Sequence, residues 1–338
     1  MEVLRLPPWD WDRAAVAPCQ QVGFARAMTK LGYWPLYLRE DDQLALALVR
    51  GWFPGIRRIT ARANLFAPGA DPAFVREALR SLGGVGIPYV KVGDTMWGVR
   101  WGELPPNWPF PRTRIVRRHT FVLDLQRSED ALVEMMQGAE RKIRRSEREG
   151  VVVRPVERPE ELSAFCRLSR ETSDRIRSRS AYTAFPNEFF EVIFRTLAPS
   201  GIARFYLGWH KDQPLAGYLF LRSADTMLYY LGGSTRDREL TAKQAPAAVF
   251  WHAIREARRE GVARFDLGGC TPTDDPNDPR HGVYAFKKRW GGRLEVFSNL
   301  EVVLSRVPFY LQERVLSPLW DRAHPLFFKI LPVRDGLQ

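Results

Sequence analysis

Apolar and polar positions alternate along this chain with two different periods. Alternation every second residue indicates strands, whereas apolar residues spaced three and four apart indicate helices. The two periods interleave from end to end, which predicts an α/β protein with a mixed sheet. The predicted strands are 44–50, 87–93, 120–125, 151–154, 203–209, 215–222, 226–232 and 263–267, and the predicted helices are 20–31, 72–82, 129–148, 160–177, 187–197 and 245–260.

A weak internal repeat accompanies this pattern. Residues 76–93 and 255–269 both contain a helix, a glycine, a short apolar strand and another glycine, and 129–153 contains a similar unit. Units about 180 residues apart indicate two copies of one α/β fold, because a solenoid needs closely spaced repeats. Residues 102–118 are rich in proline, which lacks the backbone donor of a regular element. We therefore expect an irregular linker there, between two domains.

The composition narrows the class of protein. Of the 338 residues, 45% are hydrophobic, which excludes a disordered chain. The three cysteines lie far apart, which disfavours both a disulfide framework and a zinc site. No apolar run approaches the roughly 18 residues of a membrane span, and the first residues lack the apolar stretch of a signal peptide. We therefore expect a cytoplasmic protein without a metal site.

Basic residues outnumber acidic ones, 51 against 39, for a net charge of +12. Such a surplus favours polyanionic partners, among them RNA, nucleotide phosphates and anionic lipid headgroups. Four arginines fall on one stripe of the predicted helix 129–148: Arg141, Arg144, Arg145 and Arg148. The stripe is either a solvated helix face, where neighbouring glutamates partly offset the repulsion between the arginines, or a contact for RNA phosphates. The sequence favours neither interpretation over the other.

A second basic cluster, RHGVYAFKKRWGGR, occupies 280–293. Cations interleaved with aromatic rings suit phosphates and stacked bases. The local pattern alone favours a plainer interpretation, a strand with an aromatic face in the core and a basic face in water. In such a strand, alternation sends Lys287 and Lys288 to opposite faces, so at most one of them can point into a site.

Several spaced motifs, taken together, resemble the Fem aminoacyltransferase family (FemABX), which builds peptidoglycan interpeptide bridges. The segments that carry the resemblance keep the family's order: RHTFVLDL followed by a basic helix and GVVV, ETSDR at 171–175, LAGYLF, YYLGGS, FDLGG and GVYAFKKRWGG, the last with Trp290 where the family usually has Phe. The resemblance covers 119–297. The first 118 residues match weakly, through CQQVGFARAMTKLGYW at 19–34.

The resemblance implies two tandem acetyltransferase-like (GNAT) domains, the first comprising 1–118 plus 300–338 and the second 119–299. It also implies the transfer of an amino acid from aminoacyl-tRNA to a stem-peptide amine of a UDP-linked or lipid-linked peptidoglycan precursor. No cofactor is expected, since an aminoacyl ester is already activated. A monomer in the cytoplasm is expected, and peripheral contact with the inner membrane surface stays open.

Site residues follow from the resemblance by position. Lys287 would stabilise the developing negative charge, and Asp94 would be the acidic residue of the site. The substrate-binding residues would be Thr172, Arg175, Tyr230, Lys30 and Trp34. The tRNA-binding residues would be Phe286, at the acceptor end, together with Lys288, Arg289, Arg141, Arg144, Arg145 and Arg148.

Two other functions stay open. The first is an acyl-CoA-dependent N-acyltransferase of the same fold, which is disfavoured because the loop after the strand 226–232 lacks the glycines of the Arg-x-x-Gly-x-Gly/Ala pyrophosphate-binding signature. The second is a non-catalytic basic adaptor on RNA or on the membrane surface. The apolar and basic tail at 302–333 offers a membrane-docking segment, although packing on the first domain is the favoured interpretation.

Overall fold

A computed structural model of the chain describes residues 1–51, 61–93, 97, 103–177, 185–278, 280–311 and 314, with only the helical backbone given for 175–177. The amino-terminal half contains β1 (Glu2–Leu4), α1 (Trp11–Ala14), a 3-10 turn η1 (Pro18–Gln20), α2 (Val22–Thr29), β2 (Trp34–Glu40), β3 (Gln43–Gly51), β4 (Ala61–Phe66), α4 (Pro72–Gly84) and β5 (Tyr89–Val92). A long strand, β6 (Thr113–Asp124), leads into the second half.

The second half is richer in helices. Its elements are α5 (Glu129–Glu134), α6 (Ala139–Arg148), β7 (Val151–Pro155), α7 (Pro159–Arg177), α8 (Asn187–Leu197), β8 (Ala203–His210), β9 (Gln213–Arg222), β10 (Thr226–Ser234), α9 (Arg238–Thr241), α10 (Ala245–Arg259), β11 (Arg264–Cys270), α11 (His281–Lys288), β12 (Arg293–Val303) and α12 (Arg306–Leu311). None of the helices within the described ranges is long and apolar enough to cross a membrane.

All twelve described strands form one sheet, in the order β1-β2-β3-β4-β5-β12-β6-β11-β10-β9-β8-β7. Neighbouring strands are antiparallel except for two parallel pairs, β4 with β5 and β10 with β11. The helices α4 and α10 make the crossovers that a parallel pair requires. The repeats at 76–93 and 255–269 therefore occupy equivalent positions, which confirms the expected tandem α/β fold. The unit at 129–153 differs, because its strand, β7, lies at the sheet edge, antiparallel to β8.

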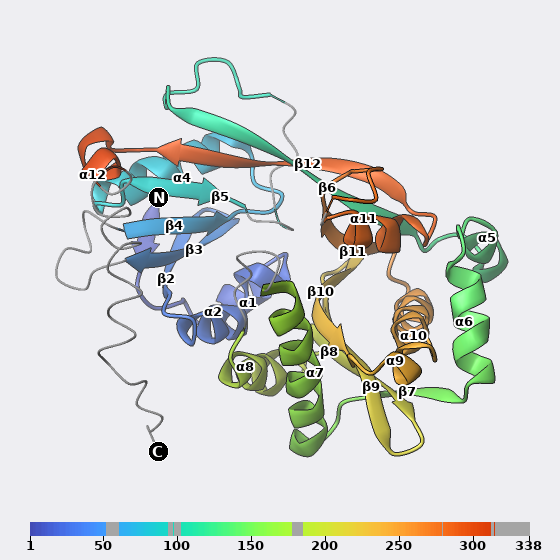
Figure 1. Cartoon of the computed structure of the whole chain (residues 1–338). Coiled ribbons are helices and arrows are strands. Elements are labelled where there is room, and N and C mark those ends of the chain that lie inside the picture. The colour runs from blue at the N-terminus through green and yellow to red at the C-terminus, as the bar shows by residue number, and fades with distance from the viewer. Residues whose placement is uncertain are drawn as a thin grey trace.

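Two long strands join the halves. β12 pairs with β6 from Arg293↔Val122 to Val302↔Thr113, and its last residues also pair with β5. Figure 1 shows this ribbon running from one half to the other. The expectation of an irregular linker throughout 102–118 is therefore wrong for its last six residues. The prolines end at Pro111, and the alternating sequence beyond them extends the strand predicted at 120–125.

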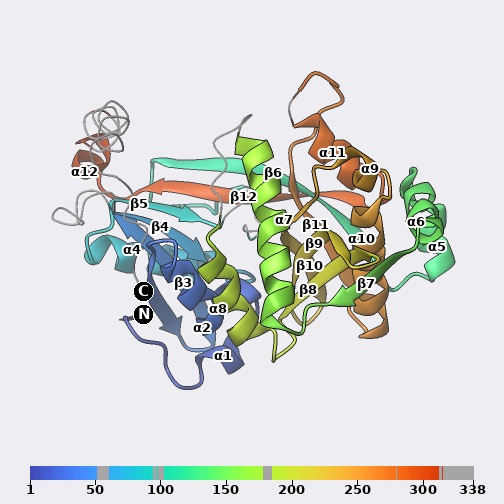
Figure 2. The same ribbon diagram turned by 60° about the horizontal axis from the view of Figure 1, so that its bottom comes forward.

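The halves also share a hydrophobic core, which we call the junction core. It combines Phe24 and Phe66 of the first half with Phe165 and Phe189 of the second. The helices α2 and α8 pack closely within it, and a Cβ on Gly23 would lie 2.6 Å from the Thr196 hydroxyl oxygen. Figure 2 shows α7 and α8 between the strands of the two halves. The domain boundaries expected near 118 and 300 fall inside β6 and β12, so the two proposed domains would be continuous through one sheet and one core.

Two further local predictions are wrong. The helix expected over 129–148 is interrupted at Gly138, whose φ of +100° is unfavourable for any residue with a side chain, so α5 and α6 are separate. Residues 281–288 form the helix α11 instead of a strand. Tyr284 and Lys287, three residues apart, are both buried, a spacing that suits a helix.

Candidate functional site

The candidate site lies where two parallel strands part. The register pairs of β10 and β11 run only from Thr226↔Arg264 to Leu228↔Asp266, although both strands continue beyond them. An irregularity follows in each strand, and Gly268 in β11 has a φ of +76°. In the first half, β4 and β5 stay paired as far as Leu65↔Val92. Only the second of the two equivalent strand pairs is therefore open in this way.

Lys287 lies between the parting strands. Its Nζ donates a hydrogen bond of 2.8 Å to the carbonyl oxygen of Gly269 on β11, and it lies 5.6 Å from the centre of the Tyr229 ring on β10. The residue is only 5% exposed. Burial lowers the pKa of Lys287 to about 8, while Cys270 and Asp266 nearby oppose that change. A lysine with this pKa is mainly protonated at pH 7, so the site holds a buried cation.

The adjacent lysine has a different environment. Lys288 points to the surface, where its Nζ lies 3.4 Å from a carboxylate oxygen of Asp274 and 5.5 Å from the centre of the Tyr284 ring. The prediction that these two lysines diverge by strand alternation was wrong in its reason, since both belong to a helix. Successive residues on a helix are about 100° apart, which is enough to bury one lysine and expose the next.

The other two α11 residues assigned to tRNA binding also differ in their surroundings. Phe286 packs into the second-half core, with its ring centre 5.2 Å from that of Phe250. Arg289, by contrast, is exposed. Through its backbone carbonyl, Arg289 accepts a 2.8 Å hydrogen bond from the N–H of Gln137, which ties the end of α11 to the α5–α6 connection.

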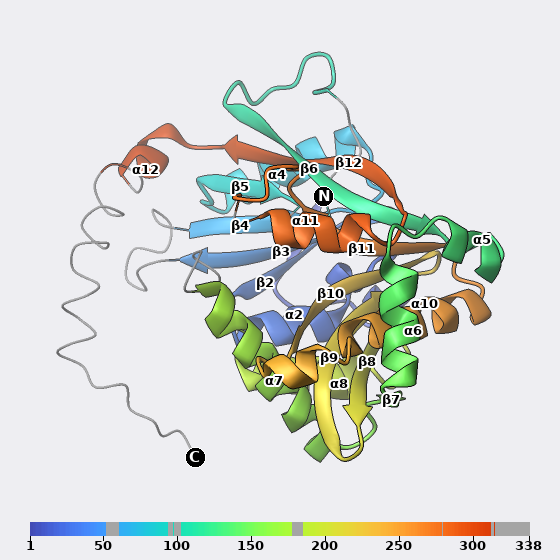
Figure 3. The ribbon, with the colours of Figure 1, turned by 45° about the vertical axis from the view of Figure 1, so that its right-hand side comes forward.

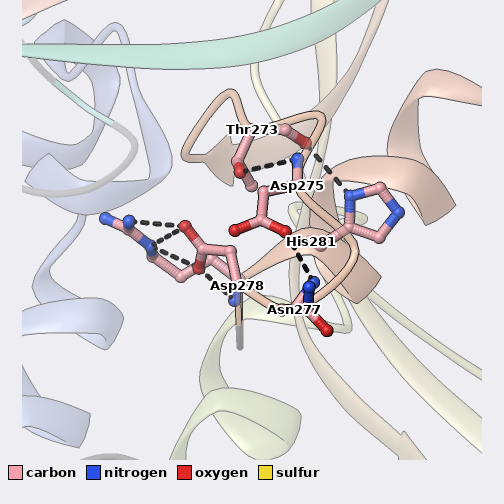
Figure 4. A network of polar contacts seen from close by, with 6 residues as sticks. Thr273, Asp275, Asn277, Asp278 and His281 are labelled. Atoms are coloured by element: carbon pink, nitrogen blue, oxygen red, sulfur yellow. Dashed lines mark hydrogen bonds and ion pairs between the residues drawn. The ribbon is translucent and has the colours of Figure 1, made fainter.

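The segment between β11 and α11 is held by its own polar groups, as Figure 4 shows. The Nδ1 of His281 lies 3.1 Å from the carbonyl oxygen of Thr273, and the carboxylate of Asp275 accepts the N–H of Asn277 at 2.9 Å. Arg280 forms an ion pair with Asp278 and holds the pKa of that carboxyl well below its usual range. Despite the acidic residues here, no group of three potential metal ligands occurs among the residues that the structure describes.

The residues assigned to substrate binding belong to several different elements of the structure. Thr172 on α7 bonds to the end of β10, where its hydroxyl accepts the N–H of Ser234 at 3.0 Å. Tyr230 is buried in the junction core, with its ring centre 6.1 Å from that of Phe24. Arg175 belongs to α7, but its side chain lies outside the described residues, as does the whole of Asp94.

The remaining two substrate-binding assignments fall in the first half. Lys30 is exposed and caps the end of α2. Trp34 begins β2 and lines an apolar pocket of about 530 Å³ together with Val3, Leu36 and Ile87. That pocket belongs to the outer strands of the first half, away from the parting of β10 and β11.

The arginine stripe is exposed as expected. All four side chains lie on the solvent side of α6, which runs along the outside of the second half (Figure 3). Arg141 lies 3.7 Å from Glu140, whereas no ion pair joins Arg144 or Arg148 to a carboxylate of the described residues. Burial, followed by the charge of Arg289, lowers the pKa of Lys142.

If the stripe contacts RNA phosphates, replacing Arg144 and Arg148 with alanine should flatten the salt dependence of tRNA binding. The logarithmic slope is expected to fall by about 1–2, because each phosphate contact releases roughly one counterion. Binding would be measured between low and moderate salt, with Arg5→Ala/Arg80→Ala as the matched control, since both of those arginines are exposed in the first half. An unchanged slope in the stripe variant would leave the solvated face as the correct interpretation.

Burial of Lys287 should reduce the stability of the fold. Its pKa in the folded protein lies below the ordinary 10.5, so the unfolded chain binds the proton more tightly and wild-type stability rises as the pH increases from about 8 to 10.5. Lys287→Met should therefore stabilise the protein by about 1–3 kcal/mol at pH 7, after allowance for the lost bond to Gly269. The gain should disappear near pH 10.5. Denaturant unfolding at several pH values would measure it, and a gain independent of pH would contradict the assignment.

The sequence prediction did not single out Asp266, Thr120 or Tyr229. Asp266 stands within the FDLGG segment, an acidic residue in a buried strand. An acidic residue in an apolar strand was the signal that could have identified Asp266, since a buried carboxylate needs specific partners. Thr120 and Tyr229 show no local signal, because their neighbours come from distant parts of the chain.

The chain is similar to several known proteins. The acetyltransferase (GNAT) domain model matches residues 134–288. The lipid II:glycine glycyltransferase of Staphylococcus epidermidis is 27% identical over 103 residues, which make up 30% of this chain and 24% of that protein. The protein of the same name from Staphylococcus aureus is 29% identical over 109 residues, or 31% of this chain and 26% of its own length. The matched stretch thus spans about a quarter of these relatives.

Two of the similar solved structures cover most of this chain. The crystal structure of FemX has a TM-score of 0.65 at 16% identity, covering 93% of this chain and 100% of its own. The C-terminal domain of a putative lysylphosphatidylglycerol synthetase from Agrobacterium fabrum has a TM-score of 0.58 at 14% identity, covering 87% and 91%. The fold is thus that of tandem acetyltransferase-like domains, and the resemblance to the Fem family is confirmed.

Proposed function

We propose that this protein transfers an aminoacyl group from aminoacyl-tRNA to an amine of the stem peptide in a peptidoglycan precursor, as a step in interpeptide bridge formation. Support comes from the relatives named lipid II:glycine glycyltransferase and from the FemX-like fold. The single observation that carries the proposal is the buried Lys287, whose Nζ donates a hydrogen bond to Gly269 at the point where β10 and β11 part.

The reaction needs a stabilised oxyanion more than it needs an activated substrate. The acceptor nitrogen forms a bond to the ester carbonyl carbon, the ester C–O bond then breaks, and the tRNA hydroxyl leaves with a proton while the amine loses one. Between these two events the carbonyl oxygen carries a negative charge. A preorganised cation in a site with little water stabilises that charge strongly. Lys287 has the charge and the burial for this role.

The acceptor amine must also be neutral when it attacks. A lysine-type amine with a pKa near 10.4 is neutral in only about one molecule in 2,500 at pH 7, which costs ~4.6 kcal/mol. A nearby carboxylate or a desolvating, cation-lined site lowers this cost. Asp94 is proposed for that role from the family resemblance.

The distribution of charge fits polyanionic substrates. The chain carries a net charge of +12, and the exposed stripe on α6 presents four arginines to solvent. Both tRNA and a pyrophosphate-linked precursor are polyanions, so each gains from this field. We assign the arginine stripe, Lys288 and Arg289 to tRNA, and Thr172, Arg175, Tyr230, Lys30 and Trp34 to the precursor.

An acyl-CoA-dependent reaction has weaker support. The loop after β10 lacks the expected glycines, and part of it folds as the short helix α9. Gln244, just before α10, has a left-handed backbone with a φ of +58°. A pyrophosphate would need an array of free backbone amides at this place. Here the N–H groups of Glu239 and Leu240 already bond to Asp237.

The deciding experiment offers the protein two acceptors, UDP-linked and lipid-linked pentapeptide, and two classes of donor, charged tRNA and acetyl-CoA. The protein would be incubated with each acceptor and either a panel of charged tRNAs or acetyl-CoA, and the products would be identified by their mass shift. We expect the mass of one amino acid to be added with one class of charged tRNA, and none with uncharged tRNA. Acylation from acetyl-CoA alone, or tRNA binding without transfer to either acceptor, would overturn the proposal.

A further inference from the structure

A buried carboxylate lies next to the candidate site without a part in the proposed chemistry. Asp266 is on β11, and its Oδ1 accepts the N–H of Gly268 at 2.8 Å. The same oxygen accepts a hydrogen bond from the Thr120 hydroxyl on β6. Buried carboxylates are rare unless they are paired or hydrogen-bonded. The close partners of Asp266 are hydrogen-bond donors, and the cation that acts on its carboxylate electrostatically is Lys287.

Thr120 holds this carboxylate across the sheet. Its hydroxyl lies between Asp266 and the carbonyl oxygen of Gly268, which is 2.9 Å away, and it has one proton to donate. An ionised carboxylate is the stronger acceptor of the two, so the proton goes to Asp266 when that residue is charged. The pair therefore favours a negative Asp266 at a place where burial alone would favour the neutral acid.

The charged groups around Lys287 come from three strands. Asp266 and Cys270 face it from β11, and Tyr229 presents its ring from β10. On β12, Glu295 faces Asp266 but forms ion pairs of 2.7 Å with both Arg264 and Arg293. Burial raises the pKa of the Cys270 thiol. Of the two groups that raise the pKa of Lys287, Cys270 and Asp266, only Asp266 is a carboxylate, whose ordinary pKa lies far below that of a thiol.

We infer that Asp266 is a positioning residue which, with Thr120, keeps Lys287 protonated where it lies between the parting strands. The inference deepens the proposed function, since the role of Lys287 in transfer rests on it. Asp266 does not touch the reacting atoms in this scheme. It acts through the ammonium group, whose bond to Gly269 fixes the direction of the charge.

The two groups affect each other's titration in opposite directions. Burial raises the pKa of Asp266, and the hydrogen bonds from Thr120 and Gly268, followed by the charge of Lys287, oppose that rise only in part. Burial lowers the pKa of Lys287 to about 8, and Asp266 is one of the two groups that raise it. Without the negative charge of Asp266, less would offset the effect of burial on Lys287, so the pKa of Lys287 should fall further. The alkaline limb of the transfer reaction should then move to lower pH.

Asp266→Asn tests this inference because asparagine keeps the shape and the acceptor oxygen. The pKa of Lys287 would be measured directly by NMR of its side-chain carbon in the full-length protein, with the signal assigned from its loss in Lys287→Met. We expect a fall of about one unit in Asp266→Asn. Compared at the same pH and substrate concentrations, transfer by the variant should be about eightfold slower than wild type at pH 8.5 and nearly unchanged at pH 6.5.

Threonine variants keep the test decisive if Asp266→Asn fails to fold. Thr120→Val removes the donor to the carboxylate and should lower the pKa of Lys287 in the same direction, while Thr120→Ser should restore it. Glu301→Gln is the matched control, because that β12 carboxylate pairs with Arg114 and not with the site. An unchanged pKa of Lys287 in both Asp266→Asn and Thr120→Val, or a loss of transfer equal at all pH values, would overturn the inference. Absence of transfer by the wild type would count against the proposed function alone, since the NMR readout does not depend on it.

Discussion

Lys287→Met is expected to reduce aminoacyl transfer roughly 100- to 1,000-fold while leaving tRNA affinity nearly intact. The loss corresponds to removal of one preorganised group that stabilises the oxyanion, an effect of about 3–4 kcal/mol. Methionine fills a similar volume without the charge, so the neighbouring strands should stay in place. Single-turnover rates with saturating charged tRNA would measure the chemical step apart from binding.

Lys288→Met is the matched control for this prediction. That lysine is partly exposed, and its contact with Asp274 is a surface ion pair, which is generally worth under about 1 kcal/mol. Its replacement should leave the chemical step close to the wild-type rate. Equal losses in the two variants, or a loss in Lys287→Met that comes only from weaker tRNA binding, would show that the role assigned to Lys287 is wrong.

Gly291→Ala is expected to destabilise the protein by about 3 kcal/mol or more. Gly291 follows α11 with a φ of +75°, and a Cβ there would overlap the carbonyl oxygen of Met135 at the end of α5. The backbone of Met135 cannot move away freely, because the next turn is tied to α11 through Gln137 and Arg289. The glycine turn therefore sets the place of α11, and with it the place of Lys287.

Gly282→Ala offers the matched comparison within the same helix. A Cβ at Gly282 meets nothing within 4 Å, and alanine favours helix over glycine by up to about 1 kcal/mol. Denaturant unfolding should place Gly291→Ala well below the wild type and Gly282→Ala at or slightly above it. Wild-type stability of Gly291→Ala would mean that the turn does not pack against α5 in this way.

Much of the fold followed from local patterns. The helices 72–82, 160–177, 187–197 and 245–260 were predicted close to their observed bounds, because a periodic apolar face is written into consecutive residues. Strands with clear alternation were found for the same reason. The prediction failed where long-range packing overrode the local pattern, most clearly at 281–288, where alternating aromatics suggested a strand.

The candidate site was predictable to a lesser extent. Lys287 was selected from a motif resemblance, and its neighbour Lys288 could not be separated from it by a correct structural argument. The partners of Lys287 come from other strands, and Thr120 and Asp266 are 146 residues apart in sequence. No spacing rule brings such residues together. Burial, which produces the unusual pKa of Lys287, exists only once the sheet has formed.

The sequence by itself therefore determined the α/β class, the two repeated crossover units and the exposed arginine stripe, and its motifs selected Lys287 as the candidate catalytic residue. These properties depend on residues that are neighbours in the chain. The tertiary structure alone decided that both halves share one sheet through β6 and β12, that α11 is a helix, and that Asp266 and Thr120 accompany Lys287. Those properties depend on strand pairing and desolvation, which join residues far apart in sequence and leave no periodic mark on either segment.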